Sequence, residues 1–281
     1  MTAGVLRKLS RVRKVKNILT ITINPIIWQW GNLQLTWHAV AMLLAIIVAV
    51  VVAAKEAQKQ GISVSEIYYV APWVMLLGFI GARLFHVFDH WGYYMSNPLQ
   101  ILAIQEGGLA IWGAVIGGAI AVIAYTRLRH LSLSLLFDTL TPALLVGQII
   151  GRVGCTINGD AWGGPTNLPW GFTYLNINDS IPTNLIGVPT HPYPVYEMIW
   201  NGLCLLLLLK LRHYFKTGGL MFFSYLALYS LGRFVLTFVR QETIVFWGLQ
   251  EAQAVALLGF AAAILGLIFL IIKQRDSAHS R

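Results

Sequence analysis

The sequence predicts an all-α integral membrane protein with about seven transmembrane helices. Of its 281 residues, 57% are hydrophobic and only 11% are charged, whereas soluble domains carry roughly 25% charged residues. The hydrophobic residues gather in long runs, and about 18 consecutive apolar residues suffice to cross a bilayer. Helices are the expected form because a backbone in lipid must satisfy its own hydrogen bonds.

Seven apolar runs are candidate spans, and no soluble domain or internal repeat separates them. They cover residues 37–54, 67–88, 109–125, 133–150, 193–209, 220–239 and 252–272. A transporter or lipid-binding protein is an alternative for such a chain. Transporter folds, however, often show two related halves, which we do not find here.

The basic residues between the spans predict the orientation. The odd-numbered loops and the C-terminal tail hold Lys55, Lys59, Arg127, Arg129, Lys210, Arg212, Lys216, Lys273, Arg275 and Arg281. The even-numbered loops hold Arg152, with Arg240 at a span end. Because cytoplasmic loops are enriched in Lys and Arg, we expect the odd loops and the C-terminus in the cytoplasm and the N-terminus outside. The same pattern explains the net charge of +9 by membrane topology, so no nucleic acid partner is expected.

The N-terminal segment opposes this orientation. Residues 7–16 contain six Lys and Arg residues about 20 positions before the first span. The following stretch ILTITINP includes polar residues and Pro25, unlike the apolar core of a signal peptide. We treat residues 1–17 as a basic N-terminal extension, and whether they belong to the native start stays open.

Residues 18–275 are expected to form one transmembrane domain with two unusual outer segments, followed by a cytoplasmic tail at 276–281. Residues 18–36 alternate apolar and polar side chains and contain Trp28 and Trp30, which predicts an interfacial arm. Residues 151–192 form a long outer loop rich in Gly, Asn and Pro, and loops of that length are usually functional or disordered. Its aromatic residues favour a folded lid or small head.

Ionisable residues inside spans are costly and are therefore candidates for function. Arg83 and Arg233 are the most informative because apolar residues flank both. Two structural alternatives remain: Arg83 pairs with Asp138, and Arg240 is an interfacial anchor. Cys155 and Cys204 lie too far apart in sequence to suggest a disulfide framework or a zinc site, so no metal is expected.

Three patterns single out candidate site residues, and the first of them is basic, which points to an anion. Tyr229, Arg233, Thr237 and Arg240 recur at helical spacing and share one helix face, and arginine binds phosphate through bidentate hydrogen bonds. Helix-to-helix hydrogen bonding is the alternative for this stripe. The Gly107–Gly108 pair precedes the third span and lets a backbone lie against a lipid headgroup, whereas Gly113 and Gly117 form a G-x-x-x-G packing pattern.

The third pattern follows the fourth span. The stretch GRVGCTINGDAWGG combines a cation (Arg152), an amide (Asn158) and a carboxylate (Asp160) with several glycines. This stretch resembles the signature of the prolipoprotein diacylglyceryl transferase family, roughly G-R-x-G-N-F-x-N-G-E-x-x-G. The matching residues are Gly151, Arg152, Gly154, Asn158, Gly159 and Gly163.

Further stretches resemble the same family in the same order, from about residue 20 to 270. They are LQLTWHAVAML, IGARLFHV with Arg83, EGGLAIWGAVIGG, HPYPVYE with His191, Pro192, Tyr196 and Glu197, and YSLGRFVLTFVRQE with Tyr229, Arg233 and Arg240. The resemblance also implies seven helices with the N-terminus outside, in the inner or plasma membrane of a bacterium.

The resemblance implies transfer of the diacylglyceryl group of phosphatidylglycerol to the lipobox cysteine of a prolipoprotein signal peptide. A thioether forms, glycerol phosphate leaves, and neither cofactor nor metal is implied. Positive charge stabilises such a leaving anion, so Arg152 and Arg233 are the expected catalytic groups, with Asp160 and Tyr229 orienting them or the glycerol hydroxyls. The expected phosphatidylglycerol-binding residues are Arg152, Asn158, Arg83, Gly107, Gly108 and Arg240.

Several residues depart from the family pattern. Trp112 stands where members carry His or Tyr, Thr237 where they carry Glu, and His38 where they carry Tyr. Cys155 replaces an Asn found in many members, and Asp160 replaces a Glu. If the family His acts as a base, that base is missing here, and His38 is our hypothetical replacement. A catalytically impaired relative is the remaining alternative, and the sequence leaves acyl-chain preference and oligomeric state open.

Overall fold

The computed structural model describes residues 19–31, 33–103, 107–178, 180–240, 244–246 and 248–279. The basic extension, Glu106 and the first residue of the expected arm lie outside these residues. The long helices are α2 (Trp37–Lys59), α3 (Val64–Asp89), α5 (Ile111–Leu128), α6 (Leu133–Asn158), α7 (Tyr193–Leu211), α8 (Leu220–Thr237) and α9 (Glu251–His279). Shorter helical elements are α4 (Trp91–Ser96), η1 (Pro98–Leu102), η3 (Thr183–Leu185) and η4 (Arg212–Tyr214).

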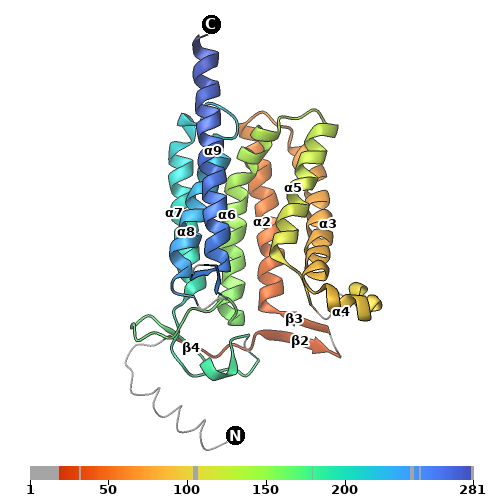
Figure 1. Cartoon of the computed structure of the whole chain (residues 1–281), viewed down its shortest axis with the longest axis vertical. Helices are drawn as coiled ribbons and strands as arrows, with labels where there is room; N and C mark the ends of the chain where they lie inside the picture. The colour runs from red at the N-terminus through yellow and green to blue at the C-terminus, as the bar shows by residue number, and fades with distance from the viewer. Residues whose placement is uncertain are drawn as a thin grey trace, which may run out of the picture. The chain divides into compact units, whose positions relative to one another are not determined.

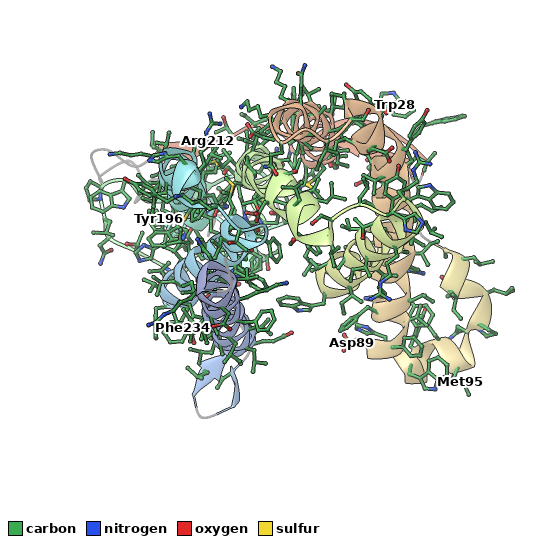
Figure 2. All side chains as sticks on the ribbon, turned by 90° about the horizontal axis from the view of Figure 1, so that it is seen from above. Trp28, Asp89, Met95, Tyr196, Arg212 and Phe234 are labelled. Atoms are coloured by element: carbon green, nitrogen blue, oxygen red, sulfur yellow. The ribbon has the colours of Figure 1, made fainter. Side chains whose placement is uncertain are left out.

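Seven helices in the described part of the chain are long and apolar enough to cross a membrane, and they coincide with the seven predicted spans. Figure 1 shows them as the long ribbons of the molecule. Figure 2 shows the side chains that these helices carry. Many large apolar ones are exposed, among them Leu43, Phe79, Ile116 and Leu265, and only 11% of the most apolar stretch of α9 is buried. An exposed apolar surface of this extent suits lipid rather than water. The chain is therefore a multi-pass membrane protein.

Helix α6 continues eight residues beyond the predicted end of the fourth span at residue 150. Hydropathy falls at Gly151, but the backbone stays helical through Asn158. The helix ends at Gly159, whose φ is +72° and whose N–H bonds to the Cys155 carbonyl at 3.0 Å. A glycine in the left-handed region is a common helix terminator. The expected loop of residues 151–192 consequently begins only after Asn158, and Arg152 and Cys155 are helical residues.

The chain divides into two compact units, residues 1–49 with 144–281 and residues 50–143. The boundaries fall within α2 and α6, so both helices contribute to both units. In the second unit α3 and α5 lie side by side (Figure 1). The predicted G-x-x-x-G pattern explains the contact, because a Cβ on Gly113 would meet the Gly81 carbonyl and one on Gly117 would meet the Leu77 carbonyl.

This packing gives a stability prediction. Gly113→Ala should lower the free energy of unfolding by about 1–3 kcal/mol, the usual cost of overpacking a tight contact, because the new methyl group would lie 2.6 Å from the Phe85 Cβ. Gly202→Ala in α7 is the matched control, since a Cβ there meets nothing within 4 Å. Thermal unfolding in detergent checks the difference, and equal melting temperatures for the two variants would contradict it.

The first unit holds α7, α8 and α9, with α8 packed against both of the others. Its core includes Leu145, Cys204, Leu208, Met221 and Tyr225. Cys204 is thus a buried packing residue. The predicted polar stripe is helical only as far as Thr237, where α8 ends, so Arg240 lies in the turn that follows.

The expected arm is built of short strands. β2 (Ile26–Trp30) pairs antiparallel with β3 (Leu33–Thr36), whereas β1 (Leu19–Ile21) pairs in parallel with β4 (Phe172–Tyr174) in the long loop. A further pair joins β5 (Ile244–Phe246) to β6 (Leu249–Gln250). The alternation of apolar and polar residues in the arm therefore reflects strands, and Trp30 on β2 is 73% exposed.

The long loop is folded, as its aromatic content predicted. Tyr174, Ile181 and Leu185 form a small buried cluster. Backbone hydrogen bonds tie the loop to other segments of its unit: Gly164 donates to the Val239 carbonyl at 2.7 Å, and Ser180 donates to the Asn158 carbonyl at 2.9 Å. Partial burial lowers the pKa of His191 in this loop, which favours a neutral ring. The loop thereby holds the ends of α6 and α8 together.

Candidate active site

Two arginines share one buried carboxylate in the first unit. Glu197 on α7 is 5% exposed. Its Oε2 forms an ion pair with Arg152 Nε from α6, and its Oε1 lies 2.9 Å from Arg233 Nη1 on α8. A buried carboxylate is stable only when it is paired and hydrogen-bonded. Helices α6, α7 and α8 therefore bring Arg152 and Arg233, the two predicted catalytic arginines, to one carboxylate.

Tyr193 completes this cluster. Its hydroxyl accepts a hydrogen bond from Arg233 Nη1 at 2.6 Å and donates one to Glu197 Oε1 at 2.9 Å. The Arg240 guanidinium lies 4.8 Å from the centre of the Tyr193 ring, a cation–π geometry. Arg240 thus joins the site from the turn after α8. Tyr229 lies one turn before Arg233 on α8, with its ring centre 5.8 Å from that of Tyr225.

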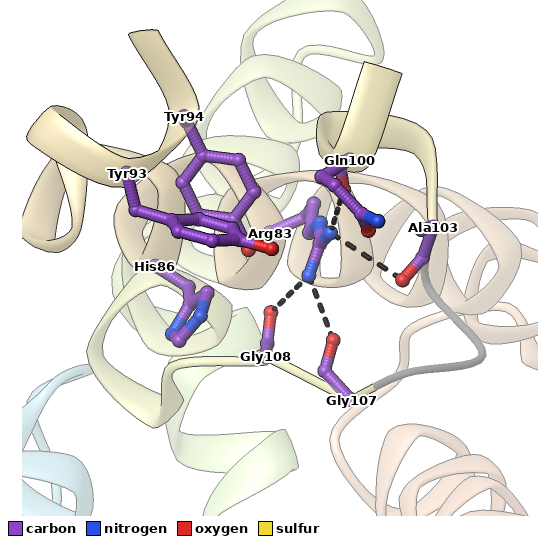
Figure 3. Close-up of a pocket in the computed structure, with 8 residues that line it drawn as sticks. All are labelled: Arg83, His86, Tyr93, Tyr94, Gln100, Ala103, Gly107 and Gly108. Carbon is purple, nitrogen blue, oxygen red and sulfur yellow. Dashed lines mark hydrogen bonds between the residues drawn. The ribbon is translucent and has the colours of Figure 1, made fainter. Parts of the chain in front are cut away.

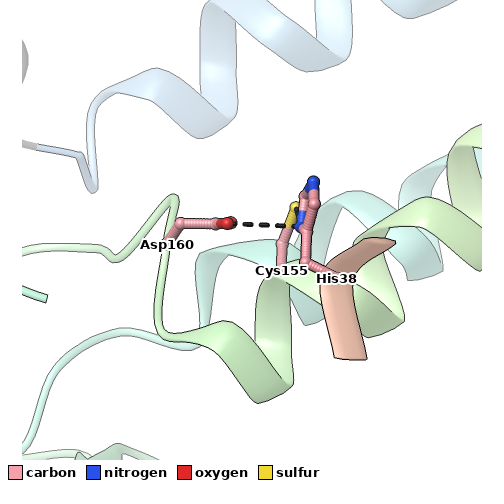
Figure 4. Close-up of side chains that lie close together, drawn as sticks. All are labelled: His38, Cys155 and Asp160. Atoms are coloured by element: carbon pink, nitrogen blue, oxygen red, sulfur yellow. Dashed lines mark hydrogen bonds and ion pairs between the residues drawn. The ribbon is translucent and has the colours of Figure 1, made fainter. Parts of the chain in front are cut away.

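A second group lies next to Arg152. His38 Nδ1, in the first turn of α2, is 3.3 Å from Asp160 Oδ2 and 3.9 Å from Cys155 Sγ (Figure 4). Asn158 Nδ2 donates to the same Asp160 oxygen at 2.9 Å. Arg152 Nη1 donates to Cys155 Sγ at 3.7 Å, so Arg152 connects this group to Glu197.

Helix packing brings His38 to Cys155. A Cβ on Gly154 would lie 2.8 Å from the Ala41 Cβ and 3.0 Å from the His38 Cα. Because Gly154 carries no side chain, the start of α2 and the end of α6 touch at this point. Among the described residues, His38, Cys155 and Asp160 are the His, Cys and acidic side chains that gather closely enough to hold a metal ion, with ligand atoms within 4.8 Å of one another.

Arg83 forms a separate site in the second unit. Its guanidinium donates to the carbonyls of Gln100 and Ala103 on one side and of Gly107 and Gly108 on the other (Figure 3). Its Nε donates to a fifth carbonyl, that of Ile101, at 2.9 Å. These five carbonyls match the five N–H donors of an arginine. Arg83 therefore bonds to backbone carbonyls and not to Asp138, the partner that the sequence left open as an alternative.

The Gly107–Gly108 pair has a backbone conformation that requires glycine. Gly107 and Gly108 have φ of +89° and +79°, which other residues rarely adopt. A Cβ on Gly108 would lie 2.6 Å from Arg83 Nη1 and 2.7 Å from the His86 ring. With Tyr93 and Tyr94, these residues line a cavity of about 180 Å³.

Most of the predicted site residues thus fall into two groups. Arg152, Asn158, Asp160, Tyr229, Arg233, Arg240 and His38 gather in the first unit, and Arg83, Gly107 and Gly108 gather in the second. Sequence reasoning gave no role to Tyr193 and Glu197, which position the arginines. Glu197 offered a signal, because a carboxylate inside an apolar helix needs a cationic partner. Thr237 is buried and donates to the Arg233 carbonyl at 2.6 Å, which orders the last turn of α8.

A family model described as prolipoprotein diacylglyceryl transferase matches residues 25–269 of this chain. The chain belongs to this family. The match to the prolipoprotein diacylglyceryl transferase model covers every described residue of both groups, from His38 to Arg240.

Individual members of the prolipoprotein diacylglyceryl transferase family are similar along nearly the whole chain. A phosphatidylglycerol–prolipoprotein diacylglyceryl transferase of Lysinibacillus sphaericus is 34% identical over 93% of this chain and 97% of its own length. Transferases with the same name are 34% identical in Lactobacillus acidophilus, over 89% of this chain and 90% of the relative, and 33% identical in Clostridioides difficile, over 88% and 95%.

Proposed function

We propose that this chain transfers the diacylglyceryl group of phosphatidylglycerol to the thiol of a prolipoprotein cysteine. Its membership of a transferase family and the names of its relatives support the reaction class. The observation that carries the residue assignment is the pair of arginines held at one carboxylate, Arg152 and Arg233 on Glu197.

The leaving group explains why arginines are needed. Attack of the acceptor sulfur on a glycerol carbon forms the C–S bond, breaks the C–O bond and places the electron pair on a phosphate oxygen. Preorganised positive charge stabilises the developing anion. Glu197 holds Arg152 through Nε alone, and Arg152 Nη2 has no acceptor in the part of the chain that the structure describes. That nitrogen is therefore available to the phosphate.

Tyr193 and Glu197 act by positioning in this proposal. They hold one terminal nitrogen of Arg233, which orients its guanidinium for a proposed contact with the phosphate. Arg240 adds positive charge beside Tyr193, and Tyr229 and Asn158 are proposed contacts to the glycerol hydroxyls.

Arg83 is proposed to shape a headgroup contact rather than to bind the phosphate directly. Its five donors are directed at carbonyls, so a direct bond to phosphatidylglycerol would break one of them. The extended Gly107–Gly108 backbone that it holds is the surface we assign to the lipid.

His38 is the proposed base for the acceptor thiol, with Asp160 orienting its ring at 3.3 Å. His38→Ala should lower the turnover number by about 100-fold or more, the usual range for a general base, while phosphatidylglycerol binding stays unchanged. The matched control is His213→Ala, since His213 lies in η4 outside both groups. Thioether formation at saturating substrate is the measurement, and full activity of His38→Ala would remove this assignment.

The topology that accompanies this function is also a proposal. We place the chain in a bacterial inner or plasma membrane with its N-terminus outside. The ends of α2 and α6 that carry the site would then face outward, where the arm and the long loop would hold the signal peptide with its lipobox cysteine.

The direct test uses the full chain in detergent with phosphatidylglycerol and a synthetic lipobox peptide. The peptide is expected to gain the mass of a diacylglyceryl group, with one glycerol phosphate released per thioether. Unmodified peptide, with phosphatidylglycerol still bound to the chain, would instead favour a lipid-binding or catalytically impaired relative.

A further inference from the structure

We propose that His38, Cys155 and Asp160 bind a zinc ion whose remaining coordination position takes the acceptor thiol; the second part rests on the proposed function. This inference revises the expectation from sequence that no metal is bound. Cys155 and His38 are separated by 117 positions, so the sequence spacing could not indicate a ligand set.

The distances between the three ligand atoms suit zinc. Bond lengths of about 2.3 Å to sulfur and 2.0–2.2 Å to nitrogen and oxygen place tetrahedral ligands roughly 3.3–3.6 Å apart. The observed separations are 3.3 Å from His38 Nδ1 to Asp160 Oδ2 and 3.9 Å from His38 Nδ1 to Cys155 Sγ. All three atoms lie within 4.8 Å of one another, so small side-chain rotations would close the site.

The chemistry of the donors also selects this metal. Zinc accepts thiolate, imidazole and carboxylate together, whereas magnesium and calcium require oxygen ligands. One thiolate and one carboxylate balance the two charges of the ion. Arg152 approaches Cys155 Sγ, and Glu197, which also pairs with Arg233, offsets only part of the Arg152 charge. The thiolate and the carboxylate of the proposed site therefore have to balance the charge of the ion by themselves.

The surroundings orient the ligands. Asn158 donates to Asp160 Oδ2, and such hydrogen bonds to a ligating carboxylate hold it in place. Gly154 permits the contact that sets His38 against Cys155. The side chains of His38 and Asp160 are 33% and 29% exposed, which gives an ion and a substrate a route to the site.

Three protein ligands leave a fourth position for substrate, the pattern of catalytic zinc. A thiol that binds zinc loses its proton to solvent, so in the zinc-bound chain His38 acts as a ligand and the ion takes over the role of the base. The bound sulfur then attacks the glycerol carbon as the C–O bond breaks, and the neutral thioether dissociates. Because Arg152 touches both Cys155 and Glu197, the nucleophile and the leaving phosphate would lie on either side of one residue.

The test measures metal first. The full chain is purified in detergent without metal-affinity resin, and its zinc content is determined by mass spectrometry. About one zinc per chain is expected in the parent and in the control Cys204→Ser, whose thiol packs in the core. Cys155→Ser and His38→Ala should bind zinc at least about 100-fold more weakly, and Asn158→Ala about 10- to 100-fold more weakly.

Cobalt titration of the metal-free chain keeps the site testable if zinc is lost during purification. A thiolate-to-cobalt absorption band is expected in the parent and in Cys204→Ser, but not in Cys155→Ser. Absence of zinc in the purified parent, together with no such band on titration, would overturn the proposal.

Activity separates this proposal from the proposed function. Chelation should stop thioether formation without displacing phosphatidylglycerol, and added zinc should restore it. If chelation leaves the rate of thioether formation unchanged, zinc does not activate the acceptor thiol, even when the ion is present in the purified chain. A parent that binds zinc but modifies no peptide contradicts the proposed function and leaves the ion site standing.

Discussion

Arg233→Ala is expected to lower the rate of diacylglyceryl transfer by about 100- to 1,000-fold, as removal of one preorganised donor to a developing oxyanion usually does. Arg233 is held by the Tyr193 hydroxyl at 2.6 Å and by Glu197 at 2.9 Å. Its guanidinium therefore needs no rearrangement when the phosphate leaves. Release of glycerol phosphate by the purified chain at saturating phosphatidylglycerol measures the effect.

Arg233→Lys separates charge from geometry. Lysine keeps the positive charge but lacks the planar fork that binds phosphate and carboxylate at the same time, so a rate between those of the parent and the alanine variant is expected. Arg129→Ala is the control for loss of an arginine ion pair, because Arg129 pairs with Glu66 at 2.8 Å outside the site. Equal rates for Arg233→Ala and Arg129→Ala would refute the assignment.

Glu197→Ala is expected to lower the free energy of unfolding by about 3–5 kcal/mol and to remove activity. Removing one partner of a buried ion pair leaves the other charge uncompensated, and here Arg152 and Arg233 would both lose their anchor. Glu197→Gln retains an acceptor for Tyr193 and Arg233 and should lose less stability. Thermal unfolding in detergent, followed beside transfer activity, measures both effects.

The control for Glu197 is Asp89→Ala. Asp89 lies 3.5 Å from His90, and the two side chains are 66% and 52% exposed, and exposed pairs contribute only about 0–1 kcal/mol. A Glu197→Ala protein as stable as Asp89→Ala would show that the two arginines find other partners. In that case the carboxylate would not be the anchor of the site.

The arginines of the proposed active site illustrate how far sequence reasoning reaches. Arg152 and Arg233 stood out because a charge in or beside an apolar run requires an explanation. Their common partner did not stand out, because Glu197 lies on a third helix and no spacing rule connects residues on different helices. Arg83 was equally conspicuous, yet its partners are backbone carbonyls, which a sequence does not distinguish from one another.

The sequence by itself determined the class of this protein and the number of its spans, because lipid imposes length and apolarity on each helix separately. It also marked Gly113 and Gly117 as a helix-packing pattern, although only the structure showed that their partner is α3. Only the tertiary structure decided that α6 continues to Asn158 and ends at Gly159, which makes Arg152 and Cys155 helical residues. It alone brought His38 to Cys155 and Asp160. Such contacts depend on how whole helices and loops pack, and side chains more than 100 positions apart meet only after the chain has folded.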